Sequence, residues 1–186
     1  MFFINPFIYA GGGDFESIAT VTVGSGGASS IEFTSISGSY QHLQIRMIQK
    51  FTTASGIISN ARMRLNSDTG NNYARHNLHG NGAGAYAAGY SSLTYAYVGW
   101  PLDSSATTAS TFSAAVIDLL DYASTSKTKT VRVLHGNEAN NSSYGNAGVS
   151  SALWNSTSAV TTITLTSDTG NWAQHTTAAL YGIKAP

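Results

Sequence analysis

The amino-acid sequence predicts an all-β protein: a jelly-roll-like antiparallel β-sandwich with an extended N-terminal anchoring segment. Short stretches in which apolar and polar residues alternate recur along most of the 186-residue chain, as in strands with one buried face. Clusters of Gly, Ser, Thr and Asn separate these stretches at the regular spacing of sandwiches and jelly rolls. A turn-forming pentapeptide, Ser-Asp-Thr-Gly-Asn, occurs at 67–71 and again at 167–171, each time after a strand-like run.

The clearest strand lies at 41–50, where Leu43, Ile45 and Met47 point to one face and the residues between them to the other. About ten strands are expected, at 17–23, 31–36, 41–50, 61–66, 95–100, 112–122, 129–135, 150–154, 160–166 and 178–184.

Three stretches are harder to assign from pattern alone. Residues 112–122 have a composition that also suits a helix, but a strand is favoured because the turn residues after them suit a hairpin to 129–135. The Gly-, Ala- and Tyr-rich stretch at 77–92 is expected to form irregular strands and wide loops. Residues 136–148 are expected to form a long polar loop.

The repeated pentapeptide is interpreted as turn chemistry rather than as an active site. Asp can accept a hydrogen bond from its own downstream backbone, and Gly tolerates the positive φ that closes a type I turn with a bulge. The structural turn residues are therefore Asp68, Gly70, Asn71, Asp168, Gly170 and Asn171. An aromatic residue and then a histidine follow each copy.

Composition limits the class of protein. Lys and Arg number 9, Asp and Glu number 9, and charged residues make up only 10% of the chain, far below the roughly 25% of ordinary domains. Zero net charge argues against nucleic acid as a partner, because phosphate contacts need a field of Lys and Arg. The chain has no cysteine. It also has no apolar run near the roughly 18 residues of a membrane span, so membrane insertion is not expected.

The N-terminal residues form a short apolar segment. Residues 2–9 are mostly hydrophobic, and the glycines at 11–13 separate them from the remainder of the chain. We therefore divide the chain into a docking segment with a glycine hinge at 1–16 and a β-sandwich domain at 17–186. The expected anchor residues are Phe2, Phe3, Ile4, Pro6, Phe7, Ile8 and Tyr9. The alternative is that this segment folds back onto its own core.

No pattern of catalytic, metal-binding or cofactor-binding residues stands out. His76 and His79 are three apart, so on a strand they point to opposite faces and cannot share a metal ion. Asp68 and Asp168 each offer one carboxylate, whereas calcium sites gather several. No acid pair has the spacing of a glycosidase. The sequence therefore predicts a non-enzymatic protein without a cofactor, with a glycan-cleaving enzyme as a remote alternative.

Aromatic residues are the remaining candidates for a binding site. They lie close together in the sequence as Tyr86, Tyr90, Tyr95, Tyr97 and Trp100. Exposed Tyr and Trp among Asn and Ser suit glycan binding or a protein interface. The alternative is aromatic packing inside the sandwich, which we expect for about half of these rings.

Several strings resemble a family of virion structural proteins of tailed bacteriophages. They are IEFTSI at 31–36 with YQHLQIR at 40–46, RLNSDTGNNY at 64–73, VID at 116–118 with DY at 121–122 and KTKT at 127–130, and ITLT at 163–166 with GNW at 170–172 and ALYGI at 179–183. The resemblance extends over nearly the whole chain from about residue 17. Its motifs are strands and turns, so it implies a family rather than a chemical activity.

The resemblance implies a place on the virion, as a head-decoration, head-fibre or tail-fibre protein. The expected partners are other virion proteins of the capsid or tail, reached through the N-terminal segment, and further copies of the chain, expected to form a homotrimer. A head decoration or head fibre is favoured because the chain has no heptad shaft of its own. The alternative is a tail-fibre receptor-binding protein whose Tyr-rich loops bind a host surface glycan.

Overall fold

The computed structural model describes residues 14–52, 59–103, 110–139 and 145–184. Within these residues no helix occurs and every extended element is a β-strand, which confirms the predicted all-β class. The strands are β1 Phe15–Thr22, β2 Ser30–Phe33, β3 His42–Thr52, β4 Ala61–Leu65, β5 Tyr73–Gly80, β6 Ala85–Leu93, β7 Ala96–Tyr97, β8 Leu102–Asp103, β9 Ser113–Leu120, β10 Lys129–Glu138, β11 Gly145–Trp154, β12 Ile163–Ser167, β13 Asn171–Trp172 and β14 Thr177–Ile183.

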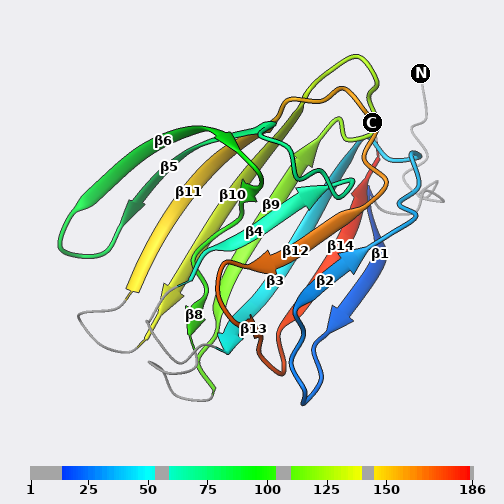
Figure 1. The fold of residues 1–186 in the computed structure, drawn as a ribbon. Helices are drawn as coiled ribbons and strands as arrows, with labels where there is room; N and C mark the ends of the chain where they lie inside the picture. Colours follow the sequence, from blue (N-terminus) through cyan, green and yellow to red (C-terminus); the bar gives the residue numbers. More distant parts are fainter. Residues whose placement is uncertain (1–13, 53–58, 104–109, 140–144, 185–186) are drawn as a thin grey trace, which may run out of the picture.

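Two sheets face each other as a β-sandwich (Figure 1). Among the described residues the large sheet has ten strands. Eight of them follow the order β1-β14-β3-β9-β10-β11-β5-β6, and β8 and β13 pair with β3. The small sheet has the order β2-β12-β4-β7. Pairing is antiparallel except between β3 and β8. The curved β5–β6 hairpin forms the end of the large sheet at the left of Figure 1.

Alternation along the strands gives the large sheet an inner face toward the small sheet and an outer face. In β10, Val131 and Val133 are fully buried, whereas Arg132 and Leu134 point outward and are exposed. Inner side chains of both sheets meet in one apolar core, which includes Leu43, Ile45, Met63, Leu65, Ile117, Val131, Ile163, Leu165 and Leu180. Burial of this face specifies the register, because a slip of one residue would expose every core side chain of a strand.

The structure corrects both expected loop regions. Residues 77–92 were expected to be irregular, but β5 and β6 pair from Tyr73 opposite Leu93 to Gly80 opposite Ala85. Residues 136–148 were expected to be a long loop, but β10 continues to Glu138 and β11 begins opposite it at Gly145. Glycine and alanine are weak strand formers alone. Here neighbouring strands supply their backbone hydrogen bonds, which sequence pattern cannot reveal.

The strand assignment at 112–122 is confirmed as β9, which rules out the helical alternative there. By contrast, the strand expected at 95–100 shortens to the two residues of β7. Two residues after its end, Gly99 has a φ of +128°, a conformation that other residues rarely adopt.

The first copy of the repeated pentapeptide closes a tight turn between β4 and β5. The Asp68 amide donates to the carbonyl of Leu65 at 3.0 Å, and Asn66 and Ser67 have positive φ angles of 51° and 56°. This is the geometry of a type I′ turn. Here the turn does not close a hairpin, since it leads from β4 in the small sheet to β5 in the large sheet. The positive φ expected at glycine is found at Gly170, at 73°, but in the first copy it falls on Asn66 and Ser67.

An aromatic residue completes each copy in the same way. The Tyr73 hydroxyl accepts a hydrogen bond from the Leu65 amide at 3.0 Å, and the Trp172 indole donates to the Leu165 carbonyl at 3.1 Å. Both rings are buried. Each aromatic side chain thus forms a hydrogen bond with the strand that precedes its turn, which explains why an aromatic residue follows both copies of the pentapeptide.

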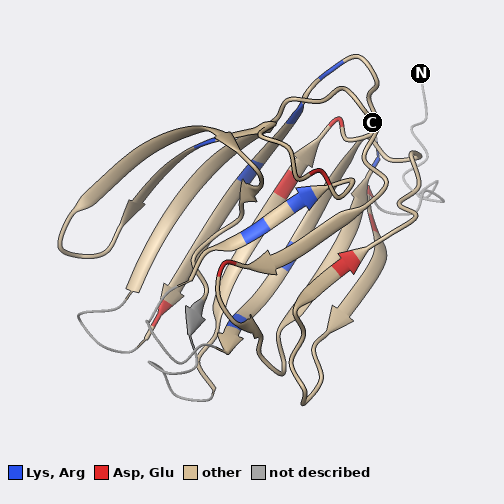
Figure 2. Cartoon of the chain, viewed as in Figure 1, with Lys and Arg blue, Asp and Glu red and all other residues tan. Residues whose placement is uncertain are grey.

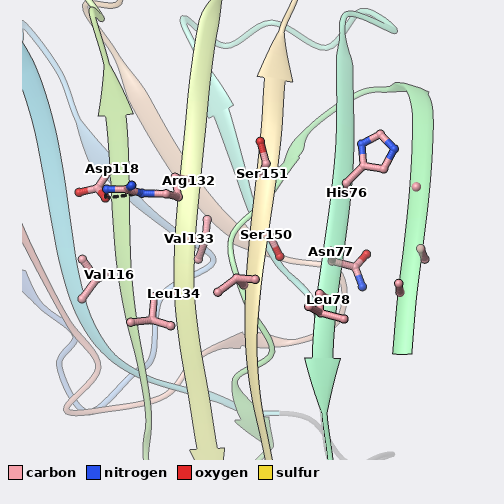
Figure 3. A pocket seen from close by; sticks show the side chains of 14 residues that line it. His76, Asn77, Leu78, Val116, Asp118, Arg132, Val133, Leu134, Ser150 and Ser151 are labelled. Carbon is pink, nitrogen blue, oxygen red and sulfur yellow. Dashed lines mark hydrogen bonds and ion pairs between the residues drawn. The ribbon is translucent and has the colours of Figure 1, made fainter. Parts of the chain in front are cut away.

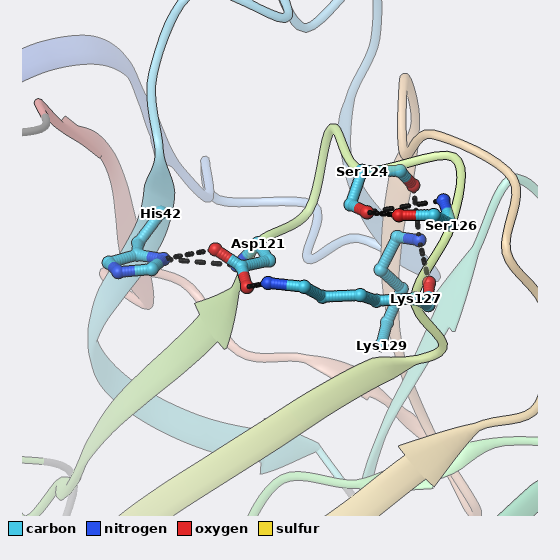
Figure 4. Close-up of polar contacts among 6 residues, drawn as sticks. All are labelled: His42, Asp121, Ser124, Ser126, Lys127 and Lys129. Atoms are coloured by element: carbon cyan, nitrogen blue, oxygen red, sulfur yellow. Dashed lines mark hydrogen bonds and ion pairs between the residues drawn. The ribbon is translucent and has the colours of Figure 1, made fainter.

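A buried lysine supports the turn between β9 and β10 (Figure 4). Lys129 is fully buried, and its Nζ donates to the carbonyl oxygens of Ser124 and Lys127 at 2.7 Å and of Thr157 at 3.2 Å. Burial lowers the pKa of this amine. The three carbonyls offset the cost of burying the ammonium group and attach the 121–128 turn to the loop before β12.

Lys129→Met should lower the free energy of unfolding by about 3 kcal/mol, because it keeps most of the alkyl chain but leaves three carbonyl oxygens without their donor. Urea denaturation measures the change. Lys127→Met is the matched control, since the Lys127 side chain is mostly exposed and its ammonium pairs with Asp121 at the surface. Equal losses in the two variants would contradict the supporting role of Lys129.

Candidate binding surfaces

The outer face of the large sheet carries a continuous row of aliphatic side chains, which we call the aliphatic row. Its members lie opposite one another in register on five adjacent strands: Val116, Leu134, Val149, Leu78 and Ala87. Leu134, Leu78 and Val149 are 60%, 52% and 47% exposed. Single exposed aliphatics are ordinary, but a contiguous set marks an interaction surface.

A shallow concavity of about 990 Å³ lies over this row (Figure 3). The next row on the same face, two residues farther along each strand, has very small side chains. Its members are Ala114, Gly136, Ala147, Gly80 and Ala85. A second hollow of about 270 Å³ opens beside Gly136 and Ala114 and shares Val116 and Leu134 with the first. Small residues next to large aliphatics thus leave room on this face for apolar groups of another molecule.

Charge beside the concavity is sparse and internally neutralised. The Arg132 guanidinium donates to Asp118 Oδ2 from Nη2 at 2.8 Å and from Nε at 3.2 Å, and Gln44 donates to the other oxygen of Asp118 at 2.8 Å. His76 and Ser151 complete this polar edge of the concavity. Figure 2 shows few charged residues along β5, β6 and β11. The part of the outer face around the concavity therefore suits contact with an apolar, uncharged surface of another molecule.

On the inner face, four rings form a cluster at the β7 end of the sandwich. The Trp100 ring lies 4.0 Å from His79, 5.4 Å from Tyr97 and 5.4 Å from His135, measured between ring centroids. The Tyr97 and His135 rings are 5.9 Å apart. All the contacts involving Trp100 are edge-to-face, a favoured arrangement of aromatic rings. This cluster joins β7 to the inner face of β5 and β10.

Tyr86 and Tyr90 extend this cluster onto the inner face of β6. Tyr86 lies opposite His79 and stacks on it at 5.2 Å, and Tyr90 lies opposite Arg75 with the guanidinium 4.6 Å from its ring. Both tyrosines are about half exposed, at 48% and 49%. They therefore present ring surface to solvent from a position set by cross-strand partners.

The five aromatic residues singled out in the sequence thus divide by exposure. Tyr97 is fully buried and offers no surface to a ligand, Trp100 and Tyr95 are half-buried, and Tyr86 and Tyr90 are exposed. Tyr95 stacks on the Arg62 guanidinium at 4.3 Å.

Sequence reasoning missed Arg75, His79 and His135, which hold these rings together. The only signal was that Tyr73, Arg75, Asn77 and His79 alternate in sequence, as they do on one face of β5.

Buried polar atoms without a hydrogen-bond partner gather around the ring cluster. In the part of the chain that the structure describes, they belong to Gln49, Arg75, His79, Tyr97, His135, Asn146 and Ser150, and to Arg62 nearby. Burial, together with the neighbouring His79, lowers the pKa of His135 to about 4, and burial also lowers that of His79. Such groups are usually satisfied by internal water, so this end of the interior is polar whereas the other end is apolar.

His135 fits only because its cross-strand partner is glycine. Gly148 lies opposite His135, and a Cβ at this position would stand 2.8 Å from His135 Cε1 and 2.9 Å from His79 Cβ. A side chain of any kind at 148 would displace both histidines.

Protonation of His135 should destabilise the fold in mild acid. Its pKa is near 4 in the folded state and about 6.5 in the unfolded state, so the unfolded chain binds more protons between these values. The free energy of unfolding should fall by about 2 kcal/mol from pH 7 to pH 4.5. Urea titrations across this range measure the fall. His135→Gln should make the free energy of unfolding depend less steeply on pH, leaving only the part due to His79. An unchanged dependence would contradict a buried, neutral His135.

The remaining predicted residues are placed as follows. The anchor residues between Phe2 and Tyr9 lie outside the described residues. The Asp68 carboxylate accepts hydrogen bonds from the Trp154 indole at 2.7 Å, the Asn72 side-chain amide at 2.9 Å and the Gly70 backbone amide at 2.8 Å, which together lower its pKa. Asp168 accepts from the Asn60 amide at 2.9 Å. Asp68 thus bonds within its own turn as predicted, whereas Asp168 links the 167–171 turn to the residues at the start of β4.

Across the described ranges, no three His, Asp or Glu side chains are grouped so that they could hold a metal ion. The same residues include no helix with the length and apolarity needed to cross a membrane. Comparisons with protein-family models, with curated proteins and with solved structures found no match for this chain.

Proposed function

We propose that this chain is a non-enzymatic structural protein of a bacteriophage particle, in which β-sandwich domains associate with one another through the outer face of the large sheet. The observation that carries the proposal is the exposed, uncharged aliphatic row on a ten-stranded sheet. The sequence resemblance to tailed-phage virion proteins supplies the context of the particle.

The strand order supports a jelly roll, a fold common in viral capsid proteins. In a jelly roll, eight strands alternate between two sheets, whose orders are 1-8-3-6 and 2-7-4-5. Taking β1, β2, β3, β4, β7, β9, β12 and β14 as these eight strands, the orders β1-β14-β3-β9 and β2-β12-β4-β7 correspond to this scheme. On this interpretation the hairpins β5–β6 and β10–β11 are additions that widen one sheet.

The size and polarity of the outer face suit an interface between copies. Eight strands about 4.8 Å apart and about seven residues long offer about 900 Å², and stable interfaces bury about 800 Å² per partner. The aliphatic row has polar neighbours such as Gln44, Arg46 and Thr20 farther along the sheet. An apolar centre with a polar rim is the usual composition of an interface.

On the particle, we propose a head-decoration or head-fibre role in which residues 2–9 dock on another virion protein. The apolar composition of these residues and the glycines that follow them support this part of the proposal.

Leu134→Glu should prevent association, because a carboxylate in the middle of the aliphatic row would be buried without a partner. Size-exclusion chromatography with light scattering should give the mass of an oligomer, expected to be a trimer, for the native chain and of a monomer for the variant. Thr34→Glu, an exposed position next to β2, is the matched control and should leave the oligomer intact. A native chain that is monomeric at micromolar concentration would overturn the proposed interface.

Removal of residues 1–10 should abolish incorporation into particles while the remaining domain folds, as judged by an unchanged β-sheet circular-dichroism spectrum. Immunogold labelling of intact particles measures incorporation. Gold spread over the head is expected; gold confined to the tail would favour a tail-fibre role, and undiminished labelling of the truncated protein would exclude the N-terminal anchor.

A second candidate function, glycan binding at a tail fibre, is favoured by one observation. Tyr86 and Tyr90 are exposed on the same face of β6 and are held in place by His79 and Arg75. Fixed aromatic rings next to polar groups are a common way of binding sugars, because an apolar ring face and hydrogen-bonding groups are presented together.

A further inference from the structure

We propose that the inner face of the β5–β6 hairpin binds acidic saccharides, with Arg75 contacting the acid group and the exposed rings of Tyr86 and Tyr90 contacting the sugar rings. This inference rests on the glycan-binding role and deepens it by naming the class of sugar.

Arg75 is a cationic side chain that is positioned to bind an anion. Its guanidinium lies between two tyrosine rings, 4.6 Å from the ring centroid of Tyr90 and 4.5 Å from that of Tyr97. Within the described residues no hydrogen bond or ion pair to the guanidinium is found, and Nε and Nη1 are buried without a partner. The rings hold the planar group in one orientation, so little side-chain entropy remains to be lost on binding.

The surroundings of Arg75 leave its charge uncompensated. Arg62 lies opposite Tyr97 in register, and its guanidinium packs 4.3 Å from the ring centroid of Tyr95, so a second guanidinium group belongs to this end of the sandwich. Within the described residues, the Asp168 carboxylate lies 3.9 Å from Arg62 Nη2 and accepts a hydrogen bond from the Asn60 amide, whereas Arg75 takes part in no ion pair. Asp168 thus serves Arg62 and leaves the charge of Arg75 without a carboxylate. In a chain with only nine basic residues, this is a local excess that favours an anion.

The tyrosines provide the second half of the site. Tyr86 and Tyr90 point to the same face of β6, about 13 Å apart along the strand, with Ala88 between them. The small alanine keeps the space between the two rings open. A short oligosaccharide can therefore lie along β6 and contact both rings while its acid group reaches Arg75, the cross-strand partner of Tyr90.

Arginine favours an acid over a neutral sugar for a geometric reason. A guanidinium offers only N–H donors, which suit the oxygens of a carboxylate or a phosphate, and it has no acceptor to offer to a hydroxyl group. In Arg75, Nη2 is the nitrogen that is not buried and can meet the acid group. Both kinds of acid group share this chemistry, so the test includes one saccharide of each kind.

The test is isothermal titration of the full chain with four probes. Tetragalacturonate carries carboxylates, and its fully methyl-esterified form has the same rings without charge; glucose 6-phosphate and glucose form the corresponding phosphate pair. At least one charged probe should bind roughly tenfold or more tightly than its neutral counterpart, and less tightly as salt is raised. The charged probe that binds identifies the acid group.

Arg75→Gln should abolish this preference by weakening the charged probe roughly tenfold or more, and Tyr90→Ala should weaken charged and neutral probes alike. Lys127→Gln is the control, since Lys127 lies on the exposed 121–128 turn and outside both proposed binding surfaces, and it should leave saccharide binding unchanged.

Equal binding of charged and neutral probes, or unchanged binding by Arg75→Gln, would overturn the acidic preference while leaving the glycan-binding role intact. Failure of all four probes to bind would overturn both. A loss with Lys127→Gln equal to that with Arg75→Gln would assign the binding to non-specific charge and would also overturn the site.

Discussion

The cross-strand register of the large sheet is the constraint on which the rest of the structure depends. Because pairing is continuous from β1 to β6, residues far apart in sequence form rows, and each row has one chemical character on each face. On the outer face, one row is aliphatic from Val116 to Ala87. One neighbouring row is made of Ala and Gly, and in the other neighbouring row Asp118 pairs with Arg132. A slip of one residue in a single strand would interrupt all these rows and expose part of the core.

The interior changes character along the sheet. Toward β14 and β3 it is filled by aliphatic side chains such as Leu43 and Leu180, whereas around Trp100 it holds histidines, amides and a tyrosine hydroxyl without protein partners. The apolar part stabilises the sandwich, since burial of aliphatic surface is the dominant favourable term in folding. The polar part makes stability depend on pH and positions the groups exposed on β5 and β6.

The scarcity of charge gives the two faces of the large sheet different partners. On the outer face, Arg132 and Asp118 neutralise each other and leave an apolar surface suited to another copy of the chain. On the inner face, the Arg75 guanidinium lies between two tyrosine rings and pairs with no carboxylate of the described residues. Because solvent screening weakens distant charges but not a close, partly buried pair, these local arrangements matter more than the zero net charge of the whole chain.

The sequence by itself determined the all-β class, the faces of the regular strands and the position of the turns, because alternation and turn chemistry are local properties. Strand β3 illustrates this: Leu43, Ile45 and Met47 are buried as their spacing predicts. Only the tertiary structure decided that Gly- and Ala-rich 77–92 forms paired strands, that Asn66 and Ser67 rather than Gly70 adopt positive φ, and that Arg75 meets Tyr90 and Tyr97. Each of these depends on hydrogen bonds or ring contacts across strands, and such contacts leave no periodic trace within a single stretch of sequence.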